Sequence, residues 1–160
     1  MKTVVIGLDC ATWKVLDMFK DVMPNLQMMK NKGCSGLLNS GIPTYTPPSW
    51  TTLSTGVNPG KHGIYGFTKI KADYSLDVVC GADSKAPYIW NILSDNDLKS
   101  AVINMPMTYP PYPFIGYMVS GMDTPSELND YTNPKEFKHQ IPTIIKQHWL
   151  VHPTPFTFNN

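Results

Sequence analysis

The sequence lacks a surplus of charge of either sign. Lysine and arginine together number 13, aspartate and glutamate number 12, and the formal net charge is +1. Proteins that hold nucleic acid by neutralising its phosphates usually carry a basic excess, so this balance argues against a nucleic-acid polymer as partner. Charged residues make up only 16% of the chain, below the usual share of about a quarter. So little charge favours a surface covered by another subunit, as in a homo-oligomer, or by a further part of the same protein.

Paired cysteines and long apolar runs are missing as well. Cys10, Cys34 and Cys80 are widely separated and form no Cys-x-x-Cys pair, so neither a disulfide framework nor a zinc knuckle is predicted. The N-terminal segment holds one lysine and a six-residue apolar run, which is too short for a secretory signal or a membrane span. We therefore expect a cytoplasmic protein in a reducing compartment, with no membrane among its partners.

Strand-like and helical segments alternate along the chain, without internal repeats or low-complexity tracts. This order favours an α/β fold with a mainly parallel sheet flanked by helices. A chain of 160 residues is long enough for one domain with a real core, and we expect a single domain over residues 1–160. Strands are predicted over residues 3–8, 34–40, 65–70, 74–81, 99–106 and 116–122, and helices over 12–19, 24–33, 48–54, 86–97 and, interrupted by Pro142, 133–149.

A carboxylate directly follows the first predicted strand. Asp9 ends the run "VVIGLD", and open α/β sheets bind their ligands at the carboxyl ends of their strands. Its short side chain could hold a divalent metal there, or could cap the helix that starts near Ala11 or Thr12. The two roles are compatible, and position alone leaves both open.

The segment "IPTYTPPSW" places Thr46 directly before two prolines. Pro47 and Pro48 suit the first turn of a helix, because their missing N–H groups would have no partner there. Thr46 then lies at or just before the N-cap, and the N–H groups of Ser49 and Trp50 are free to hold a phosphate. A threonine hydroxyl at this place could attack phosphorus if a metal lowered its pKa. Helix capping is the alternative that this segment leaves open.

Other polar and aromatic residues give weaker signals. His62, in "NPGKHGIYGF", is interpreted as a turn histidine bonded to the backbone rather than as a ligand. Lys61 is interpreted as a solvated loop lysine. Tyr109 and Tyr112 could line the site of an organic substituent, although a place in the core or on the surface is commoner for such residues.

Three segments carry a resemblance to a known family. They are "VVIGLDCATW", "GIPTYTPPSWTTLSTGVNPGKHGIYGF" and "VINMPMTYPPYPFIGYMVSGMDTPS". In these segments the sequence resembles the N-terminal part of the alkaline phosphatase superfamily, and within it the type I phosphodiesterase/nucleotide pyrophosphatase branch. The middle segment is long and specific.

The resemblance implies a metal-dependent phosphoric ester hydrolase that acts on a small phosphate ester. It implies that Thr46 is the nucleophile and forms a covalent phosphoenzyme, and that Asp9 and Thr46 bind metal. Ser49 and Trp50 would contact the substrate. Two divalent metal ions are implied, zinc in most of the family and manganese in its phosphomutase relatives.

The sequence also departs from the family pattern. Cys10 stands where glycine is common, and Ser49 stands where the pyrophosphatase branch has asparagine. No Asp-His dipeptide occurs, and the family's remaining metal ligands come later in longer chains. We therefore expect a truncated, N-terminal portion of a phosphodiesterase-like protein, which does not bind both metals alone and is incomplete or inactive by itself.

Two other interpretations stay open at this point. One is a non-catalytic α/β module that self-associates through an exposed sheet edge or apolar face. The other is a phosphomutase of the same superfamily, which would share the nucleophile and return the phosphoryl group to its substrate instead of to water.

Overall fold

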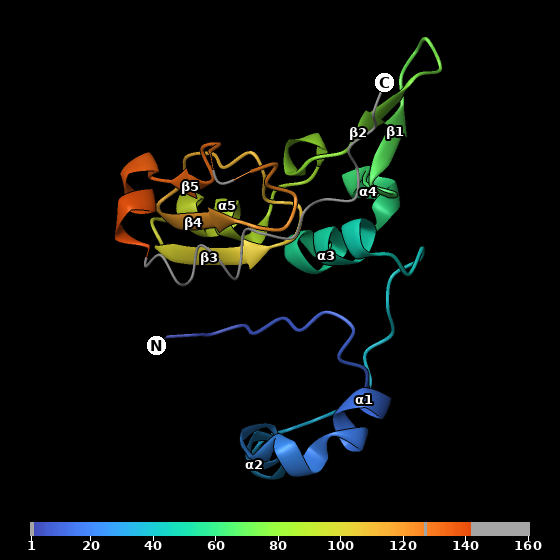
Figure 1. The fold of residues 1–160 in the computed structure, drawn as a ribbon, viewed down its shortest axis with the longest axis vertical. Coiled ribbons are helices and arrows are strands. Elements are labelled where there is room, and N and C mark those ends of the chain that lie inside the picture. Colours follow the sequence, from blue (N-terminus) through green and yellow to red (C-terminus); the bar gives the residue numbers. More distant parts are fainter. Residues whose placement is uncertain (1, 127, 142–160) are drawn as a thin grey trace. The chain divides into compact units, whose positions relative to one another are not determined.

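The structure is a computed structural model that describes residues 2–126 and 128–141, in two compact units (Figure 1). The first unit is Met1–Asn39 and the second is Ser40–Asn160. Both contain helices that follow the capping and proline signals of the sequence.

The first unit contains two α-helices and a short 3₁₀ turn. Helix α1 is capped by Thr12, whose hydroxyl accepts a hydrogen bond from the Val15 N–H, and helix α2 has its proline in the first turn and ends at Gly33. Both helices confirm the predictions over residues 12–19 and 24–33. Threonine caps and first-turn prolines are typical helix starts. The elements are α1 (Trp13–Met18), η1 (Lys20–Val22) and α2 (Pro24–Lys32).

The strands predicted over residues 3–8 and 34–40 are wrong. The described part of the first unit contains no strand. Val4, Val5 and Ile6 are 71–81% exposed, and Leu37 and Leu38 are 85% and 89% exposed. A strand needs a neighbour to bond its N–H and C=O groups, and no described segment of this unit supplies one.

The second unit begins with two helices and continues with short strands. Most of its predicted strands and helices are confirmed, but the last helix is wrong within the described residues, since only a 3₁₀ helix follows β5. Residues 142–149 of that prediction lie outside the described residues. The elements are α3 (Thr46–Thr55), α4 (Pro59–His62), β1 (Thr68–Ile70), β2 (Leu76–Val78), η2 (Gly81–Asp83), α5 (Ile89–Asp95), β3 (Ser100–Met105), β4 (Gly116–Ser120), β5 (Thr132–Asn133) and η3 (Lys135–Gln140).

The strands of the second unit form two small sheets. Strands β1 and β2 form an antiparallel hairpin. In the other sheet the order is β3-β4-β5, with β3 and β4 parallel and β4 and β5 antiparallel. Figure 1 shows α5 packed against this sheet. The α/β class is confirmed. The expected predominance of parallel pairing is not, because the hairpin is antiparallel and the three-stranded sheet is mixed.

The main apolar core lies between α5 and the three-stranded sheet. It contains Tyr88, Trp90, Val102 and Met118, each at most 7% exposed. The rings of Tyr88 and Trp90 stack with centroids 4.7 Å apart. Tyr112 packs against this cluster, and its hydroxyl accepts a hydrogen bond from the Trp90 indole. Tyr112 therefore belongs to the core rather than to a substrate wall.

Helix length bears on the question of membrane insertion. Within residues 2–126 and 128–141, none of the helices combines the length and the apolar character needed to cross a bilayer.

Candidate active site

Thr46 is the first residue of helix α3. The chain enters the helix through Tyr45, the N-cap, whose φ of −140° and ψ of 149° are extended. Pro47 and Pro48 follow and are buried, as suits prolines in a first turn. Thr46 itself is half-buried. The first turn thus presents a partly accessible threonine beside two buried prolines.

The Thr46 hydroxyl does not cap its helix. The N-cap is Tyr45, and no side chain makes a capping hydrogen bond there. Of the residues that the structure describes, none forms a hydrogen bond with the Thr46 hydroxyl. Thr12 shows the contrast, because its Oγ1 accepts from the Val15 N–H at 3.4 Å. The capping alternative for Thr46 is therefore unsupported, and its hydroxyl is left for other chemistry.

The expectation that the Ser49 N–H is free is wrong. Helix α3 begins at Thr46 rather than at Pro48, so the Ser49 N–H donates to the Tyr45 carbonyl at 3.0 Å. Trp50 is the fifth residue of the helix, where the N–H bonds to the carbonyl four residues earlier. A phosphate at this helix end would instead meet the Thr46 N–H. Ser49 retains its hydroxyl, whose Oγ lies 3.5 Å from Ser40 Oγ.

Asp9 lies in the first unit, just before α1, and is exposed. Its Oδ1 accepts a hydrogen bond from the Cys10 N–H at 2.9 Å. Thr12 caps α1, so the alternative in which Asp9 caps this helix is wrong. Its convergence with Thr46, which belongs to the second unit, remains a prediction.

The donors needed for a closed metal site are not assembled in the described ranges. No three histidine, cysteine, aspartate or glutamate side chains there come together in a way that could hold a metal ion. A zinc site takes three or four protein ligands, and Asp9 and Thr46 supply fewer than that. The residues that the structure describes therefore do not fit a complete two-metal centre.

His62 is completely buried and bonded at both ring nitrogens. Its Nδ1 accepts the Ile64 N–H at 3.1 Å, and its Nε2 lies 3.0 Å from Thr52 Oγ1. Burial lowers the pKa of the imidazole, and a hydrogen bond to the backbone of Pro48 opposes that shift. The interpretation of His62 as a turn histidine bonded to the backbone is confirmed.

Asp123 is a half-buried aspartate, with a buried carboxylate oxygen, that sequence reasoning missed. It follows β4, and its Oδ2 accepts the N–H of Tyr109, in the loop after β3, at 2.8 Å. Its Oδ1 is buried and has no hydrogen-bond partner in the described part of the chain. Burial raises the pKa of the Asp123 carboxyl, and backbone hydrogen bonds, that of Tyr109 first, oppose the shift. The available signal was its place directly after the strand predicted over residues 116–122, just as Asp9 follows the segment 3–8, for which a strand was predicted.

Asp123→Asn is expected to leave the protein at least as stable as the wild type at neutral pH. The asparagine carbonyl can still accept the Tyr109 N–H, and no charge has to be buried. The folded-state pKa of Asp123 is raised above its ordinary value of 3.8. Its contribution to stability is thus fully present below that value and is lost as pH rises through the folded-state pKa. The free energy of unfolding of Asp123→Asn relative to the wild type, measured by denaturant unfolding, should increase as the pH is raised from acid to neutral.

Asp130→Asn is the matched control for this prediction. Asp130 is exposed, and Lys135, with Nζ 2.6 Å from its Oδ2, lowers the pKa of its carboxyl. Removal of the Asp130 carboxylate should lower the free energy of unfolding more at neutral pH than at acid pH, which is the opposite trend. The change should be small, because exposed ion pairs contribute little. An Asp123→Asn stability difference that is constant with pH would contradict the raised pKa of Asp123.

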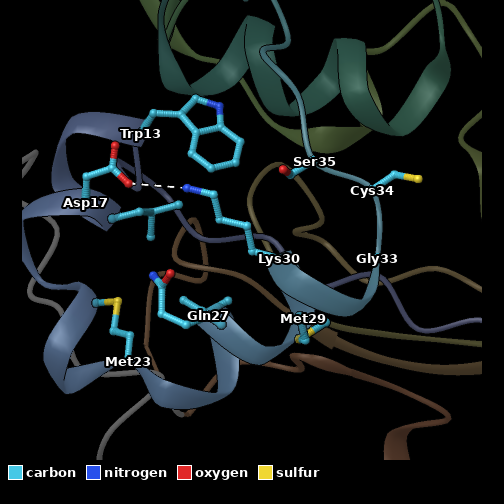
Figure 2. A pocket seen from close by; sticks show the side chains of 11 residues that line it. Trp13, Asp17, Met23, Gln27, Met29, Lys30, Gly33, Cys34 and Ser35 are labelled. Atoms are coloured by element: carbon cyan, nitrogen blue, oxygen red, sulfur yellow. Dashed lines mark hydrogen bonds and ion pairs between the residues drawn. The ribbon is translucent and has the colours of Figure 1, made fainter.

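A hollow of about 320 Å³ lies in the first unit, lined by residues from α1 to the segment after α2 (Figure 2). Lys30 Nζ lies 3.5 Å from Asp17 Oδ1 and 4.9 Å from the centroid of the Trp13 ring. None of the predicted site residues lines this hollow. It therefore contains none of the residues proposed for chemistry at Thr46.

Comparison with known families identifies the class of this chain. Residues 3–158 match the family described as type I phosphodiesterase / nucleotide pyrophosphatase. The match covers nearly the whole chain, and the chain belongs to this family, as the resemblance predicted. At the level of the family, it is a phosphodiesterase- or pyrophosphatase-like hydrolase, and the family is generally metal-dependent. Comparisons with curated proteins and with solved structures gave no match.

Proposed function

We propose that this chain supplies the nucleophile, Thr46, for the metal-dependent hydrolysis of a phosphate ester, in the first place a phosphodiester, and that its metal site is incomplete in the chain by itself. The observation that carries the proposal is the half-buried Thr46 hydroxyl at the start of α3, which no described residue engages as a cap or hydrogen-bond partner. The family assignment supports the reaction class. The position of Thr46 beside a helix end, where anions are favoured, supports the choice of residue.

The proposed reaction has two steps. First, Thr46 Oγ1 attacks phosphorus and forms a new P–O bond, while the bond from phosphorus to the departing alcohol breaks. The threonine gives up its proton, and the leaving oxygen keeps the electron pair of the broken bond and takes up a proton. The intermediate is an ester of Thr46 whose phosphorus still carries the second alcohol. Water then attacks this phosphorus, the bond from phosphorus to Thr46 Oγ1 breaks, and a proton from water restores the threonine hydroxyl as the phosphate monoester leaves.

Groups around the first turn of α3 would orient the substrate. The Thr46 N–H and the Ser49 hydroxyl are the donors proposed for the phosphate oxygens, and Trp50 is half-buried one residue further along. Tyr45 is 51% exposed and packs edge-on against Phe67 with ring centroids 5.3 Å apart. This aromatic pair, adjacent to Thr46 in the chain, supports a substrate with an organic substituent.

We also propose that turnover needs zinc or manganese, with Asp9 and Thr46 among the ligands. Hydrolysis of bis-p-nitrophenyl phosphate is expected to require added metal and to fall to background when a chelator is added, because ligands that are not preassembled release their ion readily. Asp9→Asn should weaken the response to metal, whereas Asp21→Asn, which changes another exposed aspartate of the first unit, should not. Turnover that survives complete chelation would contradict the metal requirement.

Non-catalytic self-association is a second candidate function. The observation that favours it is the exposure of apolar segments in the first unit, where Val4, Val5 and Ile6 are 71–81% exposed and Leu37 and Leu38 are 85% and 89% exposed. Contiguous apolar surface of this kind commonly marks a protein–protein contact. Light scattering tests this function, since a clean monomer would count against it and a stable oligomer without turnover would support it.

A further inference from the structure

His62 connects helix α3 to the chain that follows α4. The imidazole is completely buried, although the neighbouring Lys61 is exposed. On one side Nε2 lies 3.0 Å from Thr52 Oγ1 in α3. On the other side Nδ1 accepts the Ile64 N–H at 3.1 Å. The ring therefore links α3 to the chain just after α4, and Figure 1 shows α3 and α4 side by side.

The hydrogen bond from Ile64 determines the tautomer of His62. A backbone N–H can only donate, so Nδ1 must be the acceptor and carry no proton. In the neutral ring the proton then lies on Nε2, directed at Thr52 Oγ1. Burial favours this neutral form by lowering the pKa of the imidazole. His62 is therefore a hydrogen-bond donor toward α3.

The backbone that carries His62 is itself held in place. The His62 carbonyl accepts the Lys85 N–H at 2.9 Å. The Gly63 N–H donates to the Pro59 carbonyl at 2.8 Å, and Gly63 closes α4 in the left-handed conformation, with φ of 79°. The ring thus projects from a fixed turn, and it can serve as a reference against which α3 is oriented.

The contacts of His62 lead toward the start of α3. The imidazole Nε2 lies 3.0 Å from Thr52 Oγ1, and Thr52 stands in the same helix as Thr46, between one and two turns after it. We propose that His62 is a positioning residue, which sets the rotation of α3 through its Nε2–H bond to Thr52 and thereby directs the Thr46 hydroxyl. The inference rests on the proposed role of Thr46 as the nucleophile.

The variants His62→Asn and His62→Gln allow the two hydrogen bonds of the ring to be tested one at a time. In His62→Asn the side-chain oxygen takes the place of Nδ1 and can accept the Ile64 N–H, but the donor toward Thr52 is lost. In His62→Gln the amide nitrogen takes the place of Nε2 and can donate to Thr52, but the acceptor for Ile64 is lost. Each variant removes one hydrogen bond from the same buried site. A merely structural role therefore predicts similar losses of stability and of activity for the two.

The positioning role predicts that the two variants differ. His62→Asn should lower kcat for bis-p-nitrophenyl phosphate by about 10- to 100-fold with little change in KM, because small displacements of a reacting group have effects of that size. His62→Gln should retain most of the wild-type kcat. Thr52→Val removes the acceptor from the other side and should match His62→Asn. The double variant His62→Asn/Thr52→Val should show no larger decrease in kcat than either single variant, because both changes remove the same hydrogen bond.

Two NMR measurements test the inference without requiring turnover. The wild-type ¹⁵N spectrum should show a protonated Nε2 and an unprotonated Nδ1. Amide hydrogen exchange at Trp50 and Thr51 should be faster in His62→Asn than in His62→Gln at matched overall stability. A proton on Nδ1, or equal effects of the two variants on exchange and on kcat, would overturn the inference. A clear exchange difference in a chain without turnover would support the His62–Thr52 contact and count against the proposed function alone.

Discussion

Thr46→Ala is expected to abolish formation of a phosphoenzyme and to lower phosphodiester turnover by about 10³-fold or more, since alanine lacks the oxygen that attacks phosphorus. The fold should change little, because the hydroxyl of this half-buried residue bonds to no residue in the described ranges. Initial rates with bis-p-nitrophenyl phosphate in the presence of zinc or manganese measure the turnover. Mass spectrometry of acid-quenched protein measures the covalent intermediate, in which Thr46 carries a p-nitrophenylphosphoryl group.

Two variants control this experiment. Thr46→Ser keeps an attacking hydroxyl and should keep measurable turnover. Thr55→Ala removes another threonine hydroxyl from the same helix, one that donates to the Thr51 carbonyl at 2.7 Å, and it should turn over substrate at the wild-type rate. If Thr46→Ala and Thr55→Ala hydrolysed substrate equally fast, Thr46 would not be the nucleophile.

Gly116→Ala is expected to have the largest effect on stability. Gly116 opens β4 with φ of 152°, and a Cβ atom there would lie 1.8 Å from the Ser100 carbonyl oxygen and 2.9 Å from Cε2 of Phe114. Ser100 is the partner of Gly116 in the parallel ladder, so the clash can be relieved only if β3 and β4 move apart. We expect a loss of about 3 kcal/mol or more in the free energy of unfolding, measured by denaturant titration.

Gly56→Ala separates backbone strain from the clash. Gly56 also has a positive φ, of 70°, but a Cβ atom there would meet no atom within 4 Å. The free energy of unfolding of this variant should therefore fall by about 1 kcal/mol, the cost of placing alanine in the left-handed conformation. Equal losses for the two variants would show that the β3–β4 pairing accommodates a side chain at position 116.

Helix α3 shows how accurately local sequence signals predict the bounds of a helix. The two prolines and Gly56 predict a helix over residues 48–54, and the structure has Thr46–Thr55. The difference at the start is two residues, yet it alters the chemistry, because it places the Ser49 N–H inside the helix. Local sequence identifies Thr46 as a candidate. The N–H groups that are free near it depend on the residue at which α3 begins, and the prolines define that residue only to within one or two positions.

The features that could not be predicted depend on partners distant in the sequence. Residues 3–8 have strand-like composition, but a strand exists only where another segment bonds to it. The Oδ1 atom of Asp123 is buried, and its Oδ2 accepts the Tyr109 N–H from the loop after β3, 14 residues away in the chain. The sequence shows where this carboxylate lies relative to β4, but not that its charge is buried. The predicted convergence of Asp9 with Thr46 would be a relation of the same long-range kind.

The two prolines of α3 also bear on how this helix forms. A proline has φ fixed near about −65° in the unfolded chain as well, so ordering the first turn removes less conformational entropy than it would with other residues. Helix formation is limited by the nucleation of its first turn. The segment "TPPSW" is therefore partly preorganised before the rest of the unit folds, and α3 can grow from the end that carries Thr46.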